Sequence, residues 1–156
     1  MSTAVPQAVQ RYLRTRAVRE PWALAGEPGN DFLGAVVIPS LAEGATLLRS
    51  LDSLAANPAD SLARFLVVVV VNHRIDAAPA VKARNRADLL ALSRLQPAAG
   101  LHLARVDAAT PGREMPINNS GVGLARKIGM DLALRRLDWS AQPLLVCLDA
   151  DTLVEP

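Results

Sequence analysis

Two aspartates separated by one residue follow an apolar run near the C-terminal end of the sequence. The run LLVCL occupies residues 144–148, and Asp149 and Asp151 come directly after it. In an extended strand, residues two apart point to the same side, so the carboxylates would repel each other unless a cation lay near them. Mg²⁺ and Mn²⁺ take oxygen ligands and accept phosphate as a further ligand. The pair therefore indicates a divalent-metal site, although two solvated residues at a strand end and a turn would give the same pattern.

A second candidate binding feature is the stretch NNSGVGLARK (118–127), at the expected start of a helix. The residues in front of that helix are of the kinds that cap helix N-termini: Asn118, Asn119 and Ser120. Helix N-termini favour anions, and Arg126 and Lys127 add positive charge, so the pattern suits a diphosphate. An ordinary capped helix, in which Gly129 allows close packing, fits the same residues equally well. A dinucleotide fingerprint is disfavoured because Arg126 stands at its third glycine position.

Strand-like and helix-like segments alternate along the chain. Short apolar runs, rich in β-branched residues, predict buried strands at 34–39, 64–71, 101–107 and 143–149. Apolar residues at helical spacing predict helices at 6–19, 43–56, 79–95 and 121–138. The alternation predicts an α/β fold with a mostly parallel sheet flanked by helices, preceded by a short N-terminal helix with a solvated basic face.

In parallel sheets of this kind, ligands bind beyond the carboxyl ends of the strands. The residues just after the expected strands are therefore the candidate site: Pro39, Ser40, Leu41, Asn72, His73, Arg74, Asp107, Asp149 and Asp151. A lone histidine in such a position is more often a structural residue than a catalytic one. Neither His73 nor His102 has the spacing of a zinc ligand set.

Composition narrows the functional classes. A net charge of +2 and 3% aromatic residues argue against a nucleic-acid-binding surface. The longest unbroken apolar run, residues 65–71, is far shorter than the ~20 residues that a membrane-spanning helix needs, and no signal peptide is recognisable. We expect a protein without a transmembrane segment, located in the cytoplasm or at the cytoplasmic face of a membrane. The single cysteine, Cys147, is expected to be an inert core thiol.

Four blocks of the sequence together resemble the family 2 glycosyltransferases of the GT-A fold. In that family a motif close to VVIPxxNE precedes a helix, and IIVVDDGS, NxGxxxARNxGI and FLDADxxxEP follow in order. The matching blocks here are AVVIPSLAEGATLLRSLDSL (35–54), FLVVVVVNHR (65–74), NSGVGLARKIGMDLA (119–133) and LLVCLDADTLVEP (144–156). The agreement in order and spacing extends over residues 34–156.

The resemblance implies a Rossmann-like half-domain that binds a nucleotide-diphosphate sugar, whose sugar is transferred to an unknown acceptor. It places the nucleotide base against the loop after the first strand, which here contains Pro39, Ser40 and Leu41, with an acidic residue, Glu43, shortly after. The family's aspartates after the second strand are replaced by Asn72 and His73. An asparagine can still hydrogen-bond a base edge, so the replacement leaves the choice of base open.

The resemblance also assigns the residues around the diphosphate. Arg126 matches an arginine that lies near the donor's phosphates. Asp149 and Asp151 match the D-x-D pair, in which the first residue contacts the ribose or the metal. The second binds the Mg²⁺ or Mn²⁺ ion that bridges the diphosphate and stabilises the departing nucleoside diphosphate.

By the same resemblance the chain divides into two parts. Residues 1–33 would form an N-terminal helix and loop, and residues 34–156 the donor half of a GT-A domain. In the family, a following segment brings the acceptor site and the catalytic base. We therefore expect a truncated domain with no catalytic residue of its own.

Two other functions fit part of the pattern. A non-catalytic nucleotide-binding or interaction module would need no second half, and the apolar face left uncovered would favour self-association. A nucleotidyltransferase can share the sheet and the carboxylate metal site. It expects a loop rich in glycine and basic residues after the first strand, whereas here the first arginine of that loop is Arg49.

Overall fold

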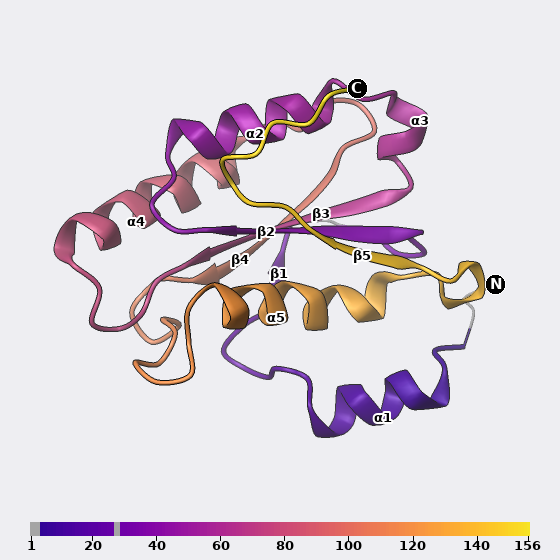
Figure 1. Ribbon diagram of the computed structural model, residues 1–156, viewed down its shortest axis with the longest axis horizontal. Helices are drawn as coiled ribbons and strands as arrows, with labels where there is room; N and C mark the ends of the chain where they lie inside the picture. The colour runs from indigo at the N-terminus through magenta and orange to yellow at the C-terminus, as the bar shows by residue number, and fades with distance from the viewer. Residues whose placement is uncertain (1–3, 27–28) are drawn as a thin grey trace.

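The computed structural model describes residues 4–26 and 29–156; residues 1–3 and 27–28 of the expected N-terminal segment lie outside the described residues. Its strands are β1 (Leu24–Ala25), β2 (Gly34–Ser40), β3 (Phe65–Asn72), β4 (His102–Ala108) and β5 (Leu144–Cys147). Its helices are α1 (Gln7–Thr15), α2 (Ala45–Ala55), α3 (Ala59–Leu62), α4 (Pro79–Arg94) and α5 (Val122–Ala133), with 3-10 turns η1 (Leu134–Arg136) and η2 (Trp139–Ala141). The strand order is β1-β4-β3-β2-β5 (Figure 1). Only β1 is antiparallel to its neighbour, so the expected α/β fold with a mostly parallel sheet is confirmed.

Strand β3 is the centre of the sheet and is buried on both faces. All of its residues after Phe65 are buried, and the register places Val68 between Val37 of β2 and Ala104 of β4. β-Branched side chains pack well on a pleated, enclosed surface, which explains why the valine run forms this strand. Helices α2 and α4 cover one face of the sheet and α5 covers the other (Figure 1).

Gly129 lets α5 lie unusually close to the sheet. A Cβ atom at this position would overlap Cγ1 of Val37 and would lie 3.0 Å from Cγ2 of Val70. The close approach that the sequence suggested for this glycine is therefore present. It brings the N-terminal end of α5 to the carboxyl ends of β2 and β3.

We predict that Gly129→Ala destabilises the protein by about 1–3 kcal/mol, because the extra methyl group overpacks the contact between α5 and the sheet. The matched control is Gly123→Ala in the same helix, where an added Cβ meets no described atom within 4 Å. That control should be neutral or stabilising, by up to about 1 kcal/mol, since alanine favours helix. Urea unfolding measures both; equal effects of the two substitutions would contradict the packing argument.

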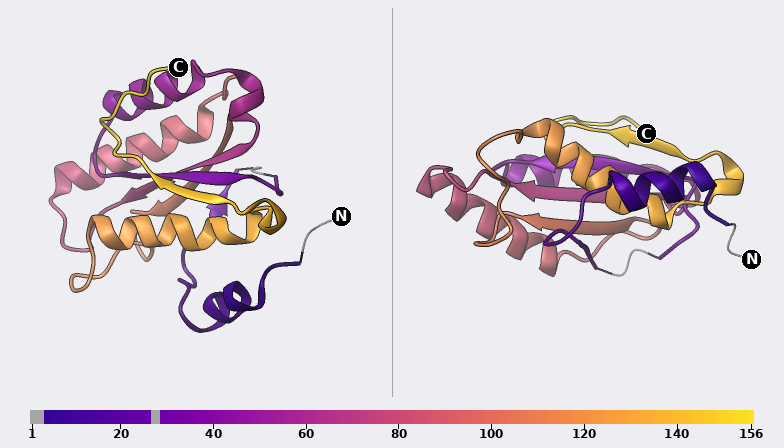
Figure 2. Two further views of the ribbon diagram at one scale, coloured as in Figure 1. Left: turned by 45° about the vertical axis from the view of Figure 1, so that its right-hand side comes forward. Right: turned by 90° about the horizontal axis from the view of Figure 1, so that it is seen from below.

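The N-terminal segment is attached to the body of the protein through the buried carboxylate of Asp131. Its Oδ1 accepts a hydrogen bond from the Tyr12 hydroxyl (2.8 Å), and its Oδ2 accepts from the backbone N–H of Val18 (2.9 Å). Lys127, one turn earlier on α5, donates to the same Oδ2 at 2.5 Å and to the carbonyl of Arg16 at 3.0 Å. Figure 2 shows α1 on the outer side of α5, crossing it, and β1 adds to the sheet beside β4. Helix α1, the residues that directly follow it and β1 are therefore packed on the sheet domain.

Replacing Asp131 by alanine should lower the free energy of unfolding by about 1–3 kcal/mol, because partly buried donors on Tyr12 and Val18 lose their acceptor. Urea unfolding provides the measurement. The control is Asp52→Ala at an exposed position of α2, which should change stability by less than about 0.5 kcal/mol. A loss for Asp131→Ala no larger than that of the control would show that this attachment contributes little.

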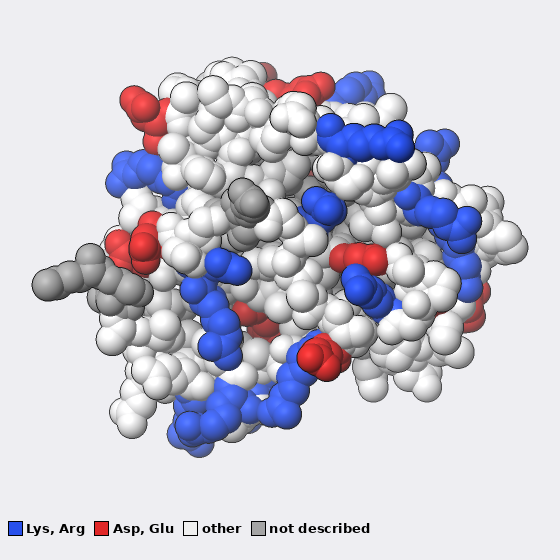
Figure 3. All heavy atoms as spheres, turned by 180° about the vertical axis from the view of Figure 1, so that it is seen from behind, with Lys and Arg blue, Asp and Glu red and all other residues white. Residues whose placement is uncertain are grey.

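The outer face of α1 is basic, as the sequence suggested. Its exposed arginines and those that directly follow it are Arg11, Arg14, Arg16 and Arg19. Basic side chains gather along the lower edge of the face seen in Figure 3, at the end of the molecule where α1 lies, and the rest of that face carries both basic and acidic groups. Within the described residues, no helix combines the length and the apolar character that crossing a membrane requires.

Strand β5 differs from the expectation of a buried strand over 143–149. It ends at Cys147 and lies at the edge of the sheet, paired only with β2. Leu144, Leu145 and Val146 are 60%, 39% and 42% exposed. An apolar run of this length forms a strand at the centre or at the edge of a sheet, so periodicity alone does not reveal its burial. Cys147 is half-buried, and burial raises the pKa of its thiol.

Helix α5 is capped differently from the expectation. The N-cap is Gly121, with φ of 105°, and no side chain caps the helix. Asn119 also has a positive φ, of 53°, so the chain enters α5 through a tight turn, and Asn118, Asn119 and Ser120 do not supply the cap. The helix ends at Ala133 and continues as η1, shorter than the expected 121–138.

Candidate functional site

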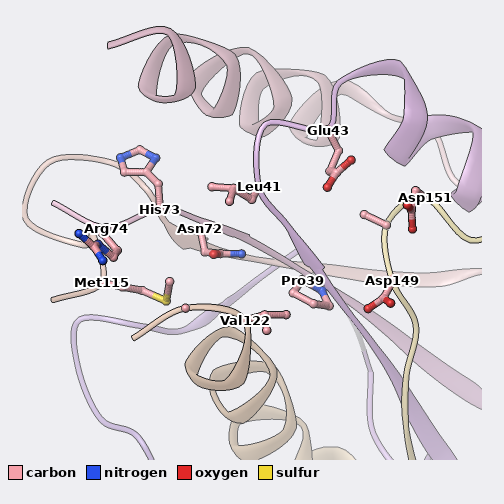
Figure 4. Close-up of a pocket in the computed structure, with 12 residues that line it drawn as sticks. Pro39, Leu41, Glu43, Asn72, His73, Arg74, Met115, Val122, Asp149 and Asp151 are labelled. Carbon is pink, nitrogen blue, oxygen red and sulfur yellow. The ribbon is translucent and has the colours of Figure 1, made fainter. Parts of the chain in front are cut away.

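A cavity of about 410 Å³ opens at the carboxyl ends of β2 and β3, between the N-terminus of α5 and the turn after β5. It is lined by Pro39, Leu41, Glu43, Asn72, His73, Arg74, Met115, Gly121, Val122, Asp149, Ala150 and Asp151 (Figure 4). Parallel strands place their carboxyl ends at one edge of the sheet, which explains why segments far apart in the sequence meet here. The location agrees with the topological prediction.

The structure brings together most of the residues that the sequence suggested, but not all of them. Ser40 and Arg126 do not line the cavity. Ser40 is fully buried, and its Oγ has no hydrogen-bond partner among the described residues. Its carbonyl accepts a hydrogen bond from the amide of Asn72 at 3.1 Å. Ser40 therefore contributes to the site through its backbone.

The loop between β2 and α2 is held in an uncommon conformation by two side chains of α4. Ala42 and Gly44 have φ values of 55° and 56°. The N–H of Ala42 donates to Oδ1 of Asn85 at 2.9 Å, and the N–H of Gly44 donates to Oδ2 of Asp88 at 3.1 Å. A positive φ is unfavourable for alanine, so this loop depends on such contacts. They fix the position of Glu43, which lies between the two anchored residues.

The amide of Asn72 joins the ends of β2 and β3. Its Nδ2 donates to the carbonyls of Ser40 (3.1 Å) and Val70 (3.0 Å), and the side chain is buried. Both amide hydrogens are therefore used inside the protein. Oδ1 remains as the group that could accept a hydrogen bond from a ligand.

The ring of His73 points away from the acidic side of the cavity and towards α4 (Figure 4). Its Nδ1 lies 2.9 Å from Nδ2 of Asn85, and the side chain is buried. Burial lowers the pKa of His73, with a further lowering by Lys82 that is opposed by Glu114 and Asp107. His73 contributes to the cavity wall as a neutral residue.

The two aspartates lie in a turn rather than in a strand. The N–H of Thr152 donates to the carbonyl of Asp149 at 3.0 Å, and Ala150 is buried between the two exposed carboxylates. The strand expected over 143–149 would have included Asp149, but it ends at Cys147, so the two carboxylates are not held on one face of a strand. The turn is secured from α2, where the Ser50 hydroxyl donates to the carbonyl of Thr152.

Glu43 and Asp151 form an acidic wall on one side of the cavity (Figure 4). Burial raises the pKa of Glu43, and the negative charges of Asp151 and Asp88 raise it further. Asp149, the third carboxylate, forms an ion pair with Arg126 at 2.8 Å. Both partners of that pair are exposed, so it contributes at most about 1 kcal/mol to stability. Lys127 points away, to Asp131.

Three lining residues were not named individually as binding residues from the sequence: Met115, Gly121 and Val122. Arg74, which the sequence suggested for its position after β3, does line the cavity. Met115 belongs to the long loop after β4, and its backbone pairs with that of Arg74. Nothing in the local sequence indicates this pairing. Asp107, suggested as a strand-end residue, accepts hydrogen bonds from the N–H groups of Ala109 and Thr110 and does not line the cavity.

The chemistry of the acidic wall suits a hard divalent cation. Carboxylate oxygens are the ligands that Mg²⁺ and Mn²⁺ prefer, and both ions complete their coordination with water or phosphate oxygens. Within the described residues, no group of three or more His, Cys, Asp or Glu side chains is close enough to form a complete ligand set. A metal held by Asp149 and Asp151 would therefore need further ligands from water or from a bound molecule.

Comparison with protein-family models, curated proteins and solved structures found no match to this chain. The interpretation of the site therefore depends on its own geometry. That geometry is a cavity with an acidic wall, an apolar floor that includes Pro39 and Val122, and one buried amide oxygen at the end of β3.

We predict that Glu43→Gln raises the stability of the protein at neutral pH, because it removes a charge that burial and two neighbouring carboxylates disfavour. Since the native pKa of Glu43 is raised, the folded wild-type protein binds a proton more readily than the unfolded chain. The advantage of the variant should therefore shrink as the pH falls through the native pKa, and vanish below about pH 4. Urea midpoints at several pH values test this.

Glu114→Gln is the control, because this substitution should change stability at neutral pH in the opposite direction. Hydrogen bonds from its own backbone N–H and that of Gly112 lower the pKa of Glu114. Its substitution should cost stability at neutral pH, with the difference disappearing as the pH falls below the native pKa. If both variants shift stability in the same direction, the electrostatic assignment of the acidic wall is wrong.

Proposed function

We propose that this chain binds a nucleotide-diphosphate sugar, with a divalent metal at Asp149 and Asp151, and serves a glycosyltransferase reaction on an unknown acceptor. The observation that carries the proposal is the convergence on one cavity of the segments by which the sequence resembles the family 2 glycosyltransferases. The loop after β2, the end of β3, the start of α5 and the Asp149–Asp151 turn all line it. A cavity of about 410 Å³ is within the range of small-molecule sites.

The nucleotide base is assigned to the side of the cavity formed by Pro39, Leu41 and Asn72. Pro39 and Leu41 offer apolar surface, and Leu41 is largely exposed. Because both amide hydrogens of Asn72 are donated to backbone carbonyls, its side chain can only accept from a ligand. An acceptor at this position can take a hydrogen bond from the ring N–H of uracil or guanine, or from the amino group of adenine, cytosine or guanine. The geometry at Asn72 therefore leaves the choice of base open.

The diphosphate is assigned to the opposite side, between Asp149, Asp151 and the start of α5. A Mg²⁺ or Mn²⁺ ion at the two aspartates would neutralise the negative charge that develops on the departing nucleoside diphosphate. Arg126 adds a cation 2.8 Å from Asp149. Gly121 and Val122, at the start of α5, line the cavity, so the N-terminus of this helix could contribute to the binding of an anion. Glu43 limits the space beside Asp151. We assign no catalytic base to the described residues.

Isothermal titration calorimetry with UDP and with GDP, each with and without Mn²⁺, tests this proposal. We expect binding that requires the metal, and Asp151→Ala should weaken it at least tenfold because a metal ligand is lost. The control is Asp52→Ala, which removes an exposed carboxylate from α2 and should bind as the wild type does.

Three results would count against the proposal. They are binding that does not depend on metal, binding that Asp151→Ala leaves unchanged, and preferential binding of nucleoside triphosphates. The last result would favour a nucleotidyltransferase. Metal-dependent binding of UDP or GDP without transfer to any acceptor would fit a nucleotide-binding module.

A further inference from the structure

Asn85, on the second turn of α4, is 0% exposed and uses both ends of its side-chain amide. Its Oδ1 accepts from the N–H of Ala42 at 2.9 Å. Its Nδ2 donates to the carbonyl of Asn72 at 2.8 Å and lies 2.9 Å from Nδ1 of His73. One buried side chain thus connects the loop after β2 with the end of β3, two of the segments that line the cavity.

Two backbone groups determine the orientation of this amide. The N–H of Ala42 can only donate, so the amide oxygen must face it, and the carbonyl of Asn72 can only accept, so the NH₂ group must face it. Half a turn of the amide would bring two donors together at Ala42 and two acceptors together at Asn72, where no solvent reaches. The second hydrogen of the NH₂ group is therefore directed at Nδ1 of His73.

We propose that Asn85 is a positioning residue for the candidate site: it keeps His73 neutral with the proton on Nε2, and it fixes the loop 41–44 against the end of β3. A proton on Nδ1 of His73 would face the Asn85 N–H across 2.9 Å, so both the imidazolium and the other neutral tautomer are disfavoured. Nε2 has no partner among the described residues in either tautomer, so the contact at Nδ1 decides between them.

Three charged groups near the His73 ring act on its protonation in opposite directions, so they do not overturn the neutral state. They are Lys82 on α4, Asp107 near the end of β4, and Glu114 in the loop that follows. Lys82 opposes protonation of His73, and the two carboxylates favour it. Asp107 accepts hydrogen bonds from Ala109 and Thr110, and Glu114 accepts one from Gly112. Among the described residues, the ring contact is with Asn85 and with neither carboxylate.

The role of Asn85 in fixing the loop 41–44 rests on the proposed function, because a bound donor would contact Leu41 and Glu43. Asn85 anchors Ala42, and Asp88, three residues further along α4, anchors Gly44. With the positive φ values at both positions, these two bonds determine which way Glu43 faces. The side of α4 that carries Asn85 and Asp88 therefore shapes the cavity without lining it.

NMR of the protein as it stands tests the assignment of His73. The chain contains two histidines, so long-range ¹H–¹⁵N spectra of the rings can be assigned with one substitution, His102→Gln. At pH 7 we expect His73 to show the pattern of a neutral ring protonated on Nε2. A ring protonated on Nδ1, or an imidazolium, would overturn the proposal without the need for any variant of Asn85.

Asn85→Asp provides the second measurement. Its carboxylate can still accept from Ala42, but it offers only acceptors to His73, so the ring should take up a proton on Nδ1 at pH 7. The control Asn118→Asp makes the same chemical change at an exposed position and should leave the His73 signals unchanged. A folded Asn85→Asp protein whose His73 pattern matches the wild type would contradict the positioning role. Should this variant not fold, the wild-type spectrum still decides.

Calorimetry with UDP and Mn²⁺ tests the role in ligand binding. We expect the affinity of Asn85→Asp to fall about tenfold, because the wall of the cavity is held less firmly. An unchanged affinity would overturn the loop assignment. If the wild-type protein binds no nucleotide, the proposed function and the ligand-binding role fail together, whereas the state of His73 is decided independently by NMR.

Discussion

The burial of β3 on both faces is the constraint on which the candidate site depends. A strand enclosed in this way needs helices over both faces of the sheet. Because β2 and β4 run parallel to β3, the carboxyl ends of all three strands meet at one edge, where their connections begin. Asn72 is the last residue of β3, and its side-chain amide donates hydrogen bonds to the carbonyls of Ser40 and Val70. The end of the buried central strand is thereby joined to the end of its neighbour, and the cavity forms where the two strands stop.

Around this fixed point, the side chains that shape the cavity are mostly supported from elements that do not touch it. Helix α4 holds the loop after β2 through Asn85 and Asp88, and α2 holds the aspartate turn through Ser50. Gly129 brings α5 close enough to the sheet for its N-terminus to reach the same place. Buried polar contacts of this kind are costly when incomplete, so each of them restricts the alternatives open to the loops. The exposed pair between Arg126 and Asp149 has no such support and can separate easily.

The alternation of apolar runs was sufficient to predict the fold class and the edge of the sheet where the cavity lies. Parallel sheets follow strict topological rules, so positions just after strands could be identified without knowing any contact. The sequence was less informative about features that depend on contacts between residues far apart in the chain. Nothing local indicates that Met115 pairs with Arg74, that Asn85 faces His73, or that the run before Asp149 lies at an edge. The predicted N-cap of α5 was also wrong. Gly121 is at the N-cap position, although Asn118, Asn119 and Ser120 are residue types that cap helices better.

The two edge strands of the sheet differ in length, direction and exposed apolar surface. At one edge, the two-residue strand β1 runs antiparallel to β4 and offers little backbone for further pairing. At the other, β5 presents a row of free backbone groups together with the exposed side chains of Leu144, Leu145 and Val146. An exposed, apolar edge strand of this kind can pair with the edge strand of another chain, which leads to association at high protein concentration. Among the large exposed apolar side chains of the described residues, these three are the ones that lie on a sheet edge, next to the acidic turn. Substitutions meant to reduce association between chains would therefore begin there.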